Sequence, residues 1–241
     1  MQDFTNRSKV TARAAKPFGA AAGVDQGLKS YMLQVYNYMA GALGLSGVVA
    51  YLVGTNETLM QAIFGTPLAF VVMLAPIGFV WYFSAKIHSM SMKSAQTSFW
   101  IFAGLMGLSM AYIFAVYTGA SIARTFFITA SVFGGMSLYG YTTGRDLSGW
   151  GSFLFMGLLG IIVASLVNIF LKSTAMEFAI SVIGVLLFVG LTAYDTQRIK
   201  QTYYQLSGDS LAKSAIMGAL SLYMDFINLF MMLLRMFGNR R

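Results

Sequence analysis

The stretch ALSLYMDFINLF at residues 219–230 places an aspartate, Asp225, in the middle of a long apolar segment. Between Lys213 and Arg235, Asp225 is the only aspartate, glutamate, lysine, arginine or histidine, and this interval is about 33 Å long in a helix, the thickness of one hydrocarbon core. A carboxylate near the bilayer midplane costs about 3 kcal/mol on insertion scales, so an acid at that depth usually has a partner and a function. A second stretch, LTAYDTQR at 191–198, supplies the candidate partner, Asp195.

The composition of the chain excludes a soluble globular protein. Hydrophobic residues make up 57% of the 241 residues and charged residues 10%, whereas soluble domains carry about 25% charge. Apolar runs of about 20 residues cross a membrane as helices, and the ten-residue alternation of barrel strands does not occur here. We therefore expect an all-α, polytopic membrane protein.

The apolar runs predict seven membrane-spanning helices, at about residues 31–53, 67–85, 98–117, 125–141, 152–171, 178–195 and 215–234. Residues 1–28 are predicted to be a basic flexible arm, and residues 29–238 the seven-helix transmembrane domain. We expect a tight turn at 118–124 and a loop at about 200–212. The adjacent glycines Gly134 and Gly135 would allow a close helix contact in the fourth span.

The net charge of +8 is better explained by membrane topology than by nucleic-acid binding, because the basic residues flank the spans and form no patch with exposed aromatic residues. With seven spans, 11 of the 16 lysines and arginines fall on the side of the amino terminus and 5 on the other side. The positive-inside rule then predicts a cytoplasmic amino terminus and an external carboxyl terminus. The absence of cysteine and the single histidine exclude thiolate zinc sites, and we expect no resident cofactor.

One face of the last span is small and polar. Residues three, four and seven positions from Asp225 share its side of a helix, and among them Gly218, Ser221, Asn228 and Met232 form, with Asp225, a small and polar stripe. A lipid-facing stripe of this kind would be costly, so it should face the bundle or a wet cavity. The alternative role for Asp225 is that of a buried, hydrogen-bonded packing group.

Asp195 also has two interpretations. Arg198 stands three residues further on, so the two residues can form an ordinary surface ion pair. However, the last two spans should be antiparallel neighbours, which would bring Asp195 to Asp225. Tyr194 and Tyr223, next to the two acids in sequence, could then donate hydrogen bonds to them.

Two carboxyl groups about 4 Å apart repel each other by about 4 kcal/mol at an effective dielectric constant of about 20. Such a pair would share one proton and act as a proton sensor. The same two acids could coordinate a calcium ion transiently, because calcium prefers carboxylate and carbonyl oxygens.

These motifs resemble a known family. AYDTQ at 193–197, LSLYMDFINLF at 220–230 and LLR at 233–235 are similar to the transmembrane Bax inhibitor motif proteins, bacterial branch, and the resemblance covers about residues 28–238. It implies a bacterial inner-membrane protein with a central last helix, and a di-aspartyl latch at Asp195 and Asp225 that senses pH and governs a calcium leak. Members with such a latch carry an arginine at the cytoplasmic end of the second helix. Lys86 is the candidate here, although a lysine cannot hold two carboxylates in a bidentate way.

Two proteolytic chemistries fit the sequence less well. Intramembrane aspartyl proteases also use two acids on adjacent helices, but LYMD at 222–225 lacks the glycines of their second motif. GLSG at 44–47 looks like the serine motif of rhomboid proteases, but its only candidate base, His88, has no orienting acid. We therefore expect no enzymatic activity.

The sequence thus favours a pH-sensitive calcium or cation leak channel gated by Asp195 and Asp225, whose partners are the lipid bilayer and calcium or protons. The competing hypothesis is a non-conducting regulator that binds a membrane protease or another integral membrane protein through its basic arm.

Overall fold

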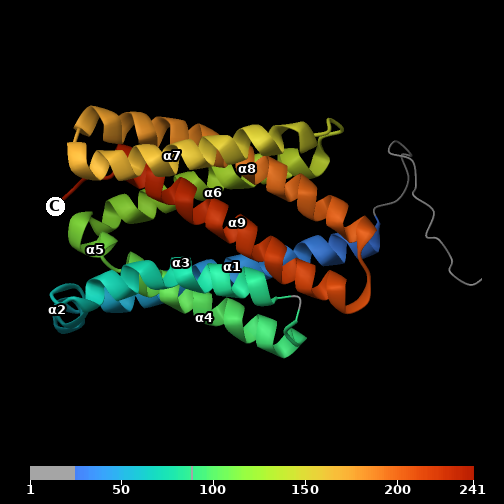
Figure 1. The fold of residues 1–241 in the computed structure, drawn as a ribbon, viewed down its shortest axis with the longest axis horizontal. Coiled ribbons are helices and arrows are strands. Elements are labelled where there is room, and N and C mark those ends of the chain that lie inside the picture. The colour runs from blue at the N-terminus through green and yellow to red at the C-terminus, as the bar shows by residue number, and fades with distance from the viewer. Residues whose placement is uncertain (1–24, 88) are drawn as a thin grey trace, which may run out of the picture.

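The computed structural model describes residues 25–87 and 89–241, and this part of the chain is almost entirely helical (Figure 1). Its long helices are α1 (Gln26–Gly54), α3 (Leu68–Lys86), α4 (Met92–Met110), α6 (Gly119–Thr142), α7 (Gly151–Leu171), α8 (Thr174–Gln205) and α9 (Gly208–Phe237). The short helices are α2 (Glu57–Phe64), α5 (Ile113–Val116), which extends the α4 span, and a 3₁₀ turn at Ser148–Trp150. Seven segments are long and apolar enough to cross a membrane, which confirms the predicted seven-span, all-α class.

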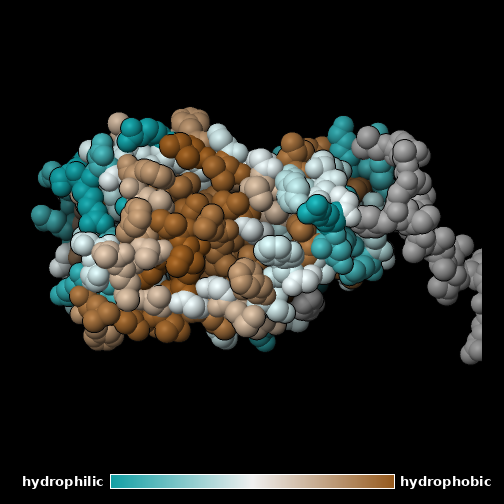
Figure 2. Space-filling view, turned by 90° about the horizontal axis from the view of Figure 1, so that it is seen from above, coloured by the Kyte–Doolittle hydropathy of each residue, from teal (hydrophilic) through white to brown (hydrophobic). Residues whose placement is uncertain are grey.

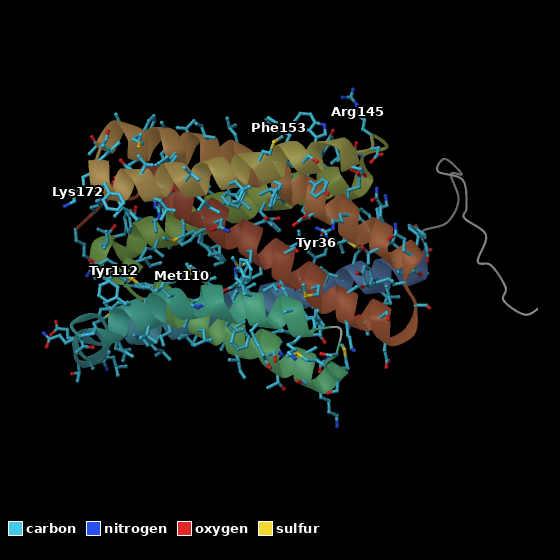
Figure 3. All side chains as sticks on the ribbon, in the orientation of Figure 1. Tyr36, Met110, Tyr112, Arg145, Phe153 and Lys172 are labelled. Carbon is cyan, nitrogen blue, oxygen red and sulfur yellow. The ribbon has the colours of Figure 1, made fainter. Side chains whose placement is uncertain are left out.

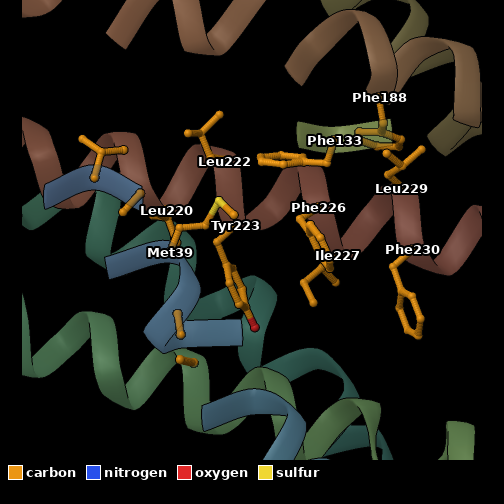
Figure 4. Packing of buried hydrophobic residues seen from close by; sticks show 14 of the residues in the cluster. Met39, Phe133, Phe188, Leu220, Leu222, Tyr223, Phe226, Ile227, Leu229 and Phe230 are labelled. Carbon is orange, nitrogen blue, oxygen red and sulfur yellow. The ribbon is translucent and has the colours of Figure 1, made fainter. Parts of the chain in front are cut away.

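Helix α9 is the centre of the bundle. In its most apolar window 72% of the residues are buried, against 11–33% in the other six spans. It packs against α8, α1, α6 and α4. In Figure 1 it runs obliquely between α7 and α8 above and α3 and α4 below. Figure 4 shows apolar side chains leaving α9 in several directions, among them Leu222, Phe226 and Phe230. The last helix is therefore central, as the family resemblance implies.

The outer helices present large apolar side chains to the surroundings. Phe70 and Trp81 on α3 are 72% and 76% exposed, and Phe153 and Phe170 on α7 are 62% and 86% exposed. The face of the molecule drawn in Figure 2 carries a broad hydrophobic belt, with hydrophilic residues collected towards the two ends. The belt is the surface that contacts lipid in an integral membrane protein.

The first helix starts earlier than the predicted span. Asp25 caps α1, because its side chain accepts hydrogen bonds from the backbone N–H groups of Gly27 and Leu28. Residues 26–28, predicted to end the basic arm, therefore belong to α1. The rest of that arm, residues 1–24, lies outside the described residues.

Two predicted loops are wrong. The turn expected at 118–124 is the first part of α6, because Thr118 caps that helix by accepting a hydrogen bond from the N–H of Ser121. The loop expected at 200–212 is reduced to residues 206–207, since α8 continues ten residues beyond Asp195. This extension is held by contacts with the start of α1, where the rings of Tyr203 and Tyr31 lie 5.7 Å apart.

The carboxyl-terminal residues fasten the end of α9 to its neighbours. The N–H of Arg241 donates to the carbonyl of Val116 at 2.9 Å, and the N–H of Thr118 donates to the carbonyl of Asn239 at 3.1 Å. The guanidinium of Arg240 binds the carboxylate of Glu177 on α8 at 2.8 Å. The end of the central helix is therefore attached both to the α5–α6 junction and to the beginning of α8.

Close contact between α6 and α8 depends on Gly140, not on the glycine pair expected from the sequence. A Cβ atom at residue 140 would collide with the backbone of Ala193, whereas at Gly134 and Gly135 it would meet nothing within 4 Å. The pair at 134–135 lies on the exposed side of α6. The prediction of a helix contact there is wrong, because hydropathy and residue size do not reveal where two helices cross.

Replacing Gly140 with alanine should lower the melting temperature of the purified protein in detergent, because α6 and α8 must move apart. Overpacking of this kind typically costs about 1–3 kcal/mol. Gly134→Ala on the exposed side of the same helix is the matched control and should leave the melting temperature unchanged. Equal melting temperatures for the two variants would contradict this account of the helix crossing.

Candidate functional site

Asp225 lies in the middle of the central helix and is almost fully enclosed by protein. The residue is 6% exposed, and its Oδ2 atom is buried without a hydrogen-bond partner among residues 25–87 and 89–241. Buried carboxyl oxygens are normally hydrogen-bonded, and an unpaired one is costly. The structure thus places the most demanding polar group of the last span at the centre of the bundle.

Asp195 lies on α8, the helix that packs most extensively against α9. Its side chain is 14% exposed, and its carboxyl group interacts electrostatically with that of Asp225. Arg198 is the cation that interacts with Asp195, but its Nη1 atom lies 4.0 Å from Oδ1 of the aspartate, and the arginine side chain is 68% exposed. An ion pair so long and so exposed contributes little stability. The two acids therefore lie on neighbouring helices and within electrostatic reach of each other, and Arg198 stands on the exposed side of Asp195.

Two contacts fix the register of the antiparallel helices α8 and α9. A Cβ atom at Gly218 would lie 3.0 Å from Ile199, and one at Gly184 would lie 2.9 Å from the sulfur of Met232. The contact between Ile199 and Gly218 aligns the two antiparallel helices. Asp195 is four residues before Ile199 on α8, so it lies opposite Leu222, which is four residues after Gly218 on α9. The Gly184–Met232 contact places Asp195 opposite the preceding residue of α9, so Asp225 is three to four residues further along, an offset of about 4.5–6 Å along the helix axis, or about one turn.

The small and polar stripe on α9 faces α8, not lipid. Its two ends, Gly218 and Met232, touch α8 directly. Between them, Asn228 donates its side-chain amide to the carbonyl of Met224 at 2.9 Å, and Ser221 is half-buried. All residues of this stripe lie on the same side of α9 as Asp225. We call the α8–α9 contact that contains them the seam, and it is small and polar inside an apolar bundle.

The two tyrosines do not serve the acids as expected. The hydroxyl of Tyr223 is 2.7 Å from the hydroxyl of Ser46 on α1, and its ring packs edge-on against Phe102 of α4 (Figure 4). The hydroxyl of Tyr194 lies against Gly151 at the start of α7. The prediction that they donate to the aspartates is wrong, because adjacent residues on a helix point in different directions.

Lys86 is not brought to the acid pair. It is exposed at the end of α3, a helix that packs against α4 and α2, and neither carboxyl group interacts with it. His88 lies outside the described residues. The serine of the rhomboid-like motif, Ser46, is buried between α1 and α4, where its hydroxyl is 2.8 Å from the carbonyls of Ala42 and Ala103.

A polar network that was not expected from the sequence holds the two residues after Asp195 on α8. Ser137 on α6 hydrogen-bonds both Tyr36 of α1 at 2.6 Å and Thr196 of α8 at 3.0 Å. Gln197 donates to the carbonyl of Arg145 at 2.8 Å and accepts from the N–H of Leu147 at 2.7 Å. Figure 3 shows Tyr36 and Arg145 in the same half of the molecule. The available signal was the pair of polar residues at 196–197, directly after Asp195.

The two acids alone offer few ligands to a metal ion. In the part of the chain that the structure describes, no three histidine, cysteine, aspartate or glutamate side chains gather at one place. Calcium takes six to eight oxygen ligands. Asp195 and Asp225 alone would therefore supply only part of the ligands of a calcium ion, and water would have to supply the others.

Replacing Tyr223 with phenylalanine should lower the free energy of unfolding by about 0.5–1.5 kcal/mol, because one buried hydrogen bond to Ser46 is lost. Tyr82→Phe, in which the ring is 54% exposed, is the control and should have no effect on unfolding. Both variants should keep any pH response of the wild type, since neither hydroxyl serves the acids. A Tyr223→Phe variant that loses its pH response would contradict this assignment.

Comparisons with known proteins agree with the fold and the motif. The sequence model of the family described as "Bax1-I: Inhibitor of apoptosis-promoting Bax1" matches residues 28–241. The chain is 49% identical over 219 residues to "Inner membrane protein YbhL" of Escherichia coli (strain K12), a match that covers 89% of this chain and 94% of that protein. It is 53% identical over 218 residues to "Uncharacterized protein RP147" of Rickettsia prowazekii, covering 90% and 92% of the two chains. The protein is therefore an integral membrane protein that belongs to the Bax inhibitor family.

Proposed function

We propose that this protein is a pH-sensitive cation leak channel that passes calcium and is gated by Asp195 and Asp225. The observation that supports the proposal is the buried Oδ2 atom of Asp225, which has no hydrogen-bond partner among the described residues and lies on a helix packed against the one that carries Asp195. We place the channel in the bacterial inner membrane, the location in the name of its relative YbhL, with a cytoplasmic amino terminus.

The gating step follows from electrostatic repulsion between the acids. A pair that holds one proton carries a single negative charge, and the two helices can pack closely. When that proton leaves, two like charges face each other in a medium that screens them poorly, and their repulsion reaches a few kcal/mol. This repulsion acts directly on the α8–α9 contact, the packing of the central helix.

The seam suits cations better than anions. No lysine or arginine occurs in α8 before Arg198, or in α9 between Lys213 and Arg235. The buried hydroxyls of Thr192 and Thr196 donate to carbonyls of their own helix at 2.7 Å, so their oxygens can act only as acceptors, and that of Thr196 accepts from Ser137 at 3.0 Å. A route lined by carboxyl and hydroxyl oxygens favours positively charged ions.

The proposed channel has no catalytic residue and no resident cofactor, and its partners are the bilayer and the ions. The alternative, a regulator of a membrane protease, would use the basic arm. Because residues 1–24 lie outside the described residues, the geometry of the acid pair is the stronger basis for a proposal.

Calcium flux into liposomes that hold the purified protein tests the proposal. Flux should change steeply between about pH 5 and pH 8, where a coupled carboxyl pair exchanges its second proton. Asp225→Asn should abolish the pH dependence, because the variant lacks the carboxyl group that releases the shared proton. Asp195→Asn should keep a titration shifted to lower pH, because the repelling neighbour is gone.

Asp146→Asn is the matched control, because this aspartate is exposed in the loop after α6, where it accepts hydrogen bonds from the nearby Ser148, among them one from its backbone N–H at 2.9 Å. Its pH profile should equal that of the wild type. Melting temperatures show whether each variant is folded. A wild-type flux that does not vary with pH would refute the latch, and the absence of calcium flux at every pH would favour the regulator.

A further inference from the structure

A surface pocket of about 250 Å³ lies between the beginning of α8 and the end of α9. It is lined from α8 by Glu177 and Ser181, and from the end of the chain by Arg235 and Arg240. Ser181 is only 1% exposed, so it lies at the inner side of this pocket. The pocket therefore reaches into the contact between the two helices that carry the acids.

Met232 lies directly beneath the pocket. It is one helical turn before Arg235 on α9, and it packs on Gly184, one turn after Ser181 on α8. A Cβ atom at residue 184 would be 2.9 Å from the methionine sulfur, so the glycine makes the space that this side chain occupies. Met232 is 8% exposed and fills the seam at this level.

The acid pair lies on the other side of Met232. Going inward along the same stripe of α9, Asn228 follows after one turn and Asp225 after two, about 10 Å from Met232. Met232 is the outermost buried apolar side chain on this side of α9, and the buried Leu229 is the next one inward. Met232 therefore separates a pocket with a charged rim from the buried, unpartnered oxygen of Asp225.

We propose that Met232, packed on Gly184, is a hydrophobic gate that closes the α8–α9 seam between the acid pair and the pocket. This inference rests on the proposed channel function. A short apolar constriction stops ions by excluding water. Methionine suits this role because its unbranched side chain has three rotatable bonds, so it can move out of the seam after a small separation of α8 and α9.

Thiol accessibility tests the gate without relying on calcium flux. The chain has no cysteine, so Asn228→Cys gives a protein with one thiol just inside the gate. A charged, membrane-impermeant thiol reagent is added to vesicles from the face that carries the carboxyl terminus. Combining Asn228→Cys with Met232→Ala should raise the labelling rate several-fold, because the apolar block is shortened.

Met231→Ala in the same Asn228→Cys background is the matched control. The side chain of Met231 points about 100° away from that of Met232 around α9, so the labelling rate of this variant should stay low. Met232→Val, a smaller truncation, provides a second test if the alanine variant does not fold, which its melting temperature shows. Labelling of the Met232 variants that is no faster than that of Met231→Ala would overturn the gate.

Calcium flux then separates this inference from the proposed function. In an otherwise wild-type chain, Met232→Ala should increase flux several-fold while leaving the midpoint of the pH response unchanged, because the acid pair is intact. Faster labelling without calcium flux in any variant would keep the gate and reject the calcium channel. Calcium flux that Met232→Ala leaves unchanged would keep the channel and reject the gate.

Discussion

The need to enclose a carboxyl group halfway through the membrane governs the rest of this structure. Asp225 cannot face lipid, so α9 is surrounded by α8, α1, α6 and α4 and becomes the most buried of the seven spans. The same requirement explains why α9 is small and polar towards α8 and strongly apolar elsewhere. The outer helices α3 and α7 carry no such group, and they present large apolar side chains to lipid instead.

Close packing in this bundle comes mainly from glycine, because apolar side chains gain little from leaving lipid for protein. Gly140 lets α6 cross the backbone of α8 at Ala193, Gly107 brings α4 against the backbone of Ser46, and Gly218 and Gly184 admit side chains of the opposite helix. Two of these four glycines lie in the α8–α9 seam. This seam is therefore the contact at which a small change in helix separation has the largest effect on the acids.

Much of the architecture could be predicted from the sequence because the thickness of the membrane limits apolar runs. Hydropathy predicted the seven spans, and helical spacing around Asp225 predicted the stripe that faces α8. Hydropathy could not predict that α8 continues to Gln205, because it indicates where a helix leaves the hydrocarbon and not where the helix ends. Which residues touch across the bundle was equally inaccessible, so Tyr223, Tyr194 and Lys86 were given to the acids although the structure places them elsewhere.

The central claim is that charge repulsion between Asp195 and Asp225 separates α8 from α9, and a distance between these helices tests it most directly. Because the chain has no cysteine, spin labels can be attached at Ile183→Cys on α8 and Phe237→Cys on α9, two positions that are 56% and 53% exposed. The account predicts that the distance between the labels increases as the pH rises through the transition of the pair, and that it stays constant in Asp225→Asn. A distance that does not change with pH in the wild type, or one that changes equally in Asp225→Asn, would contradict it.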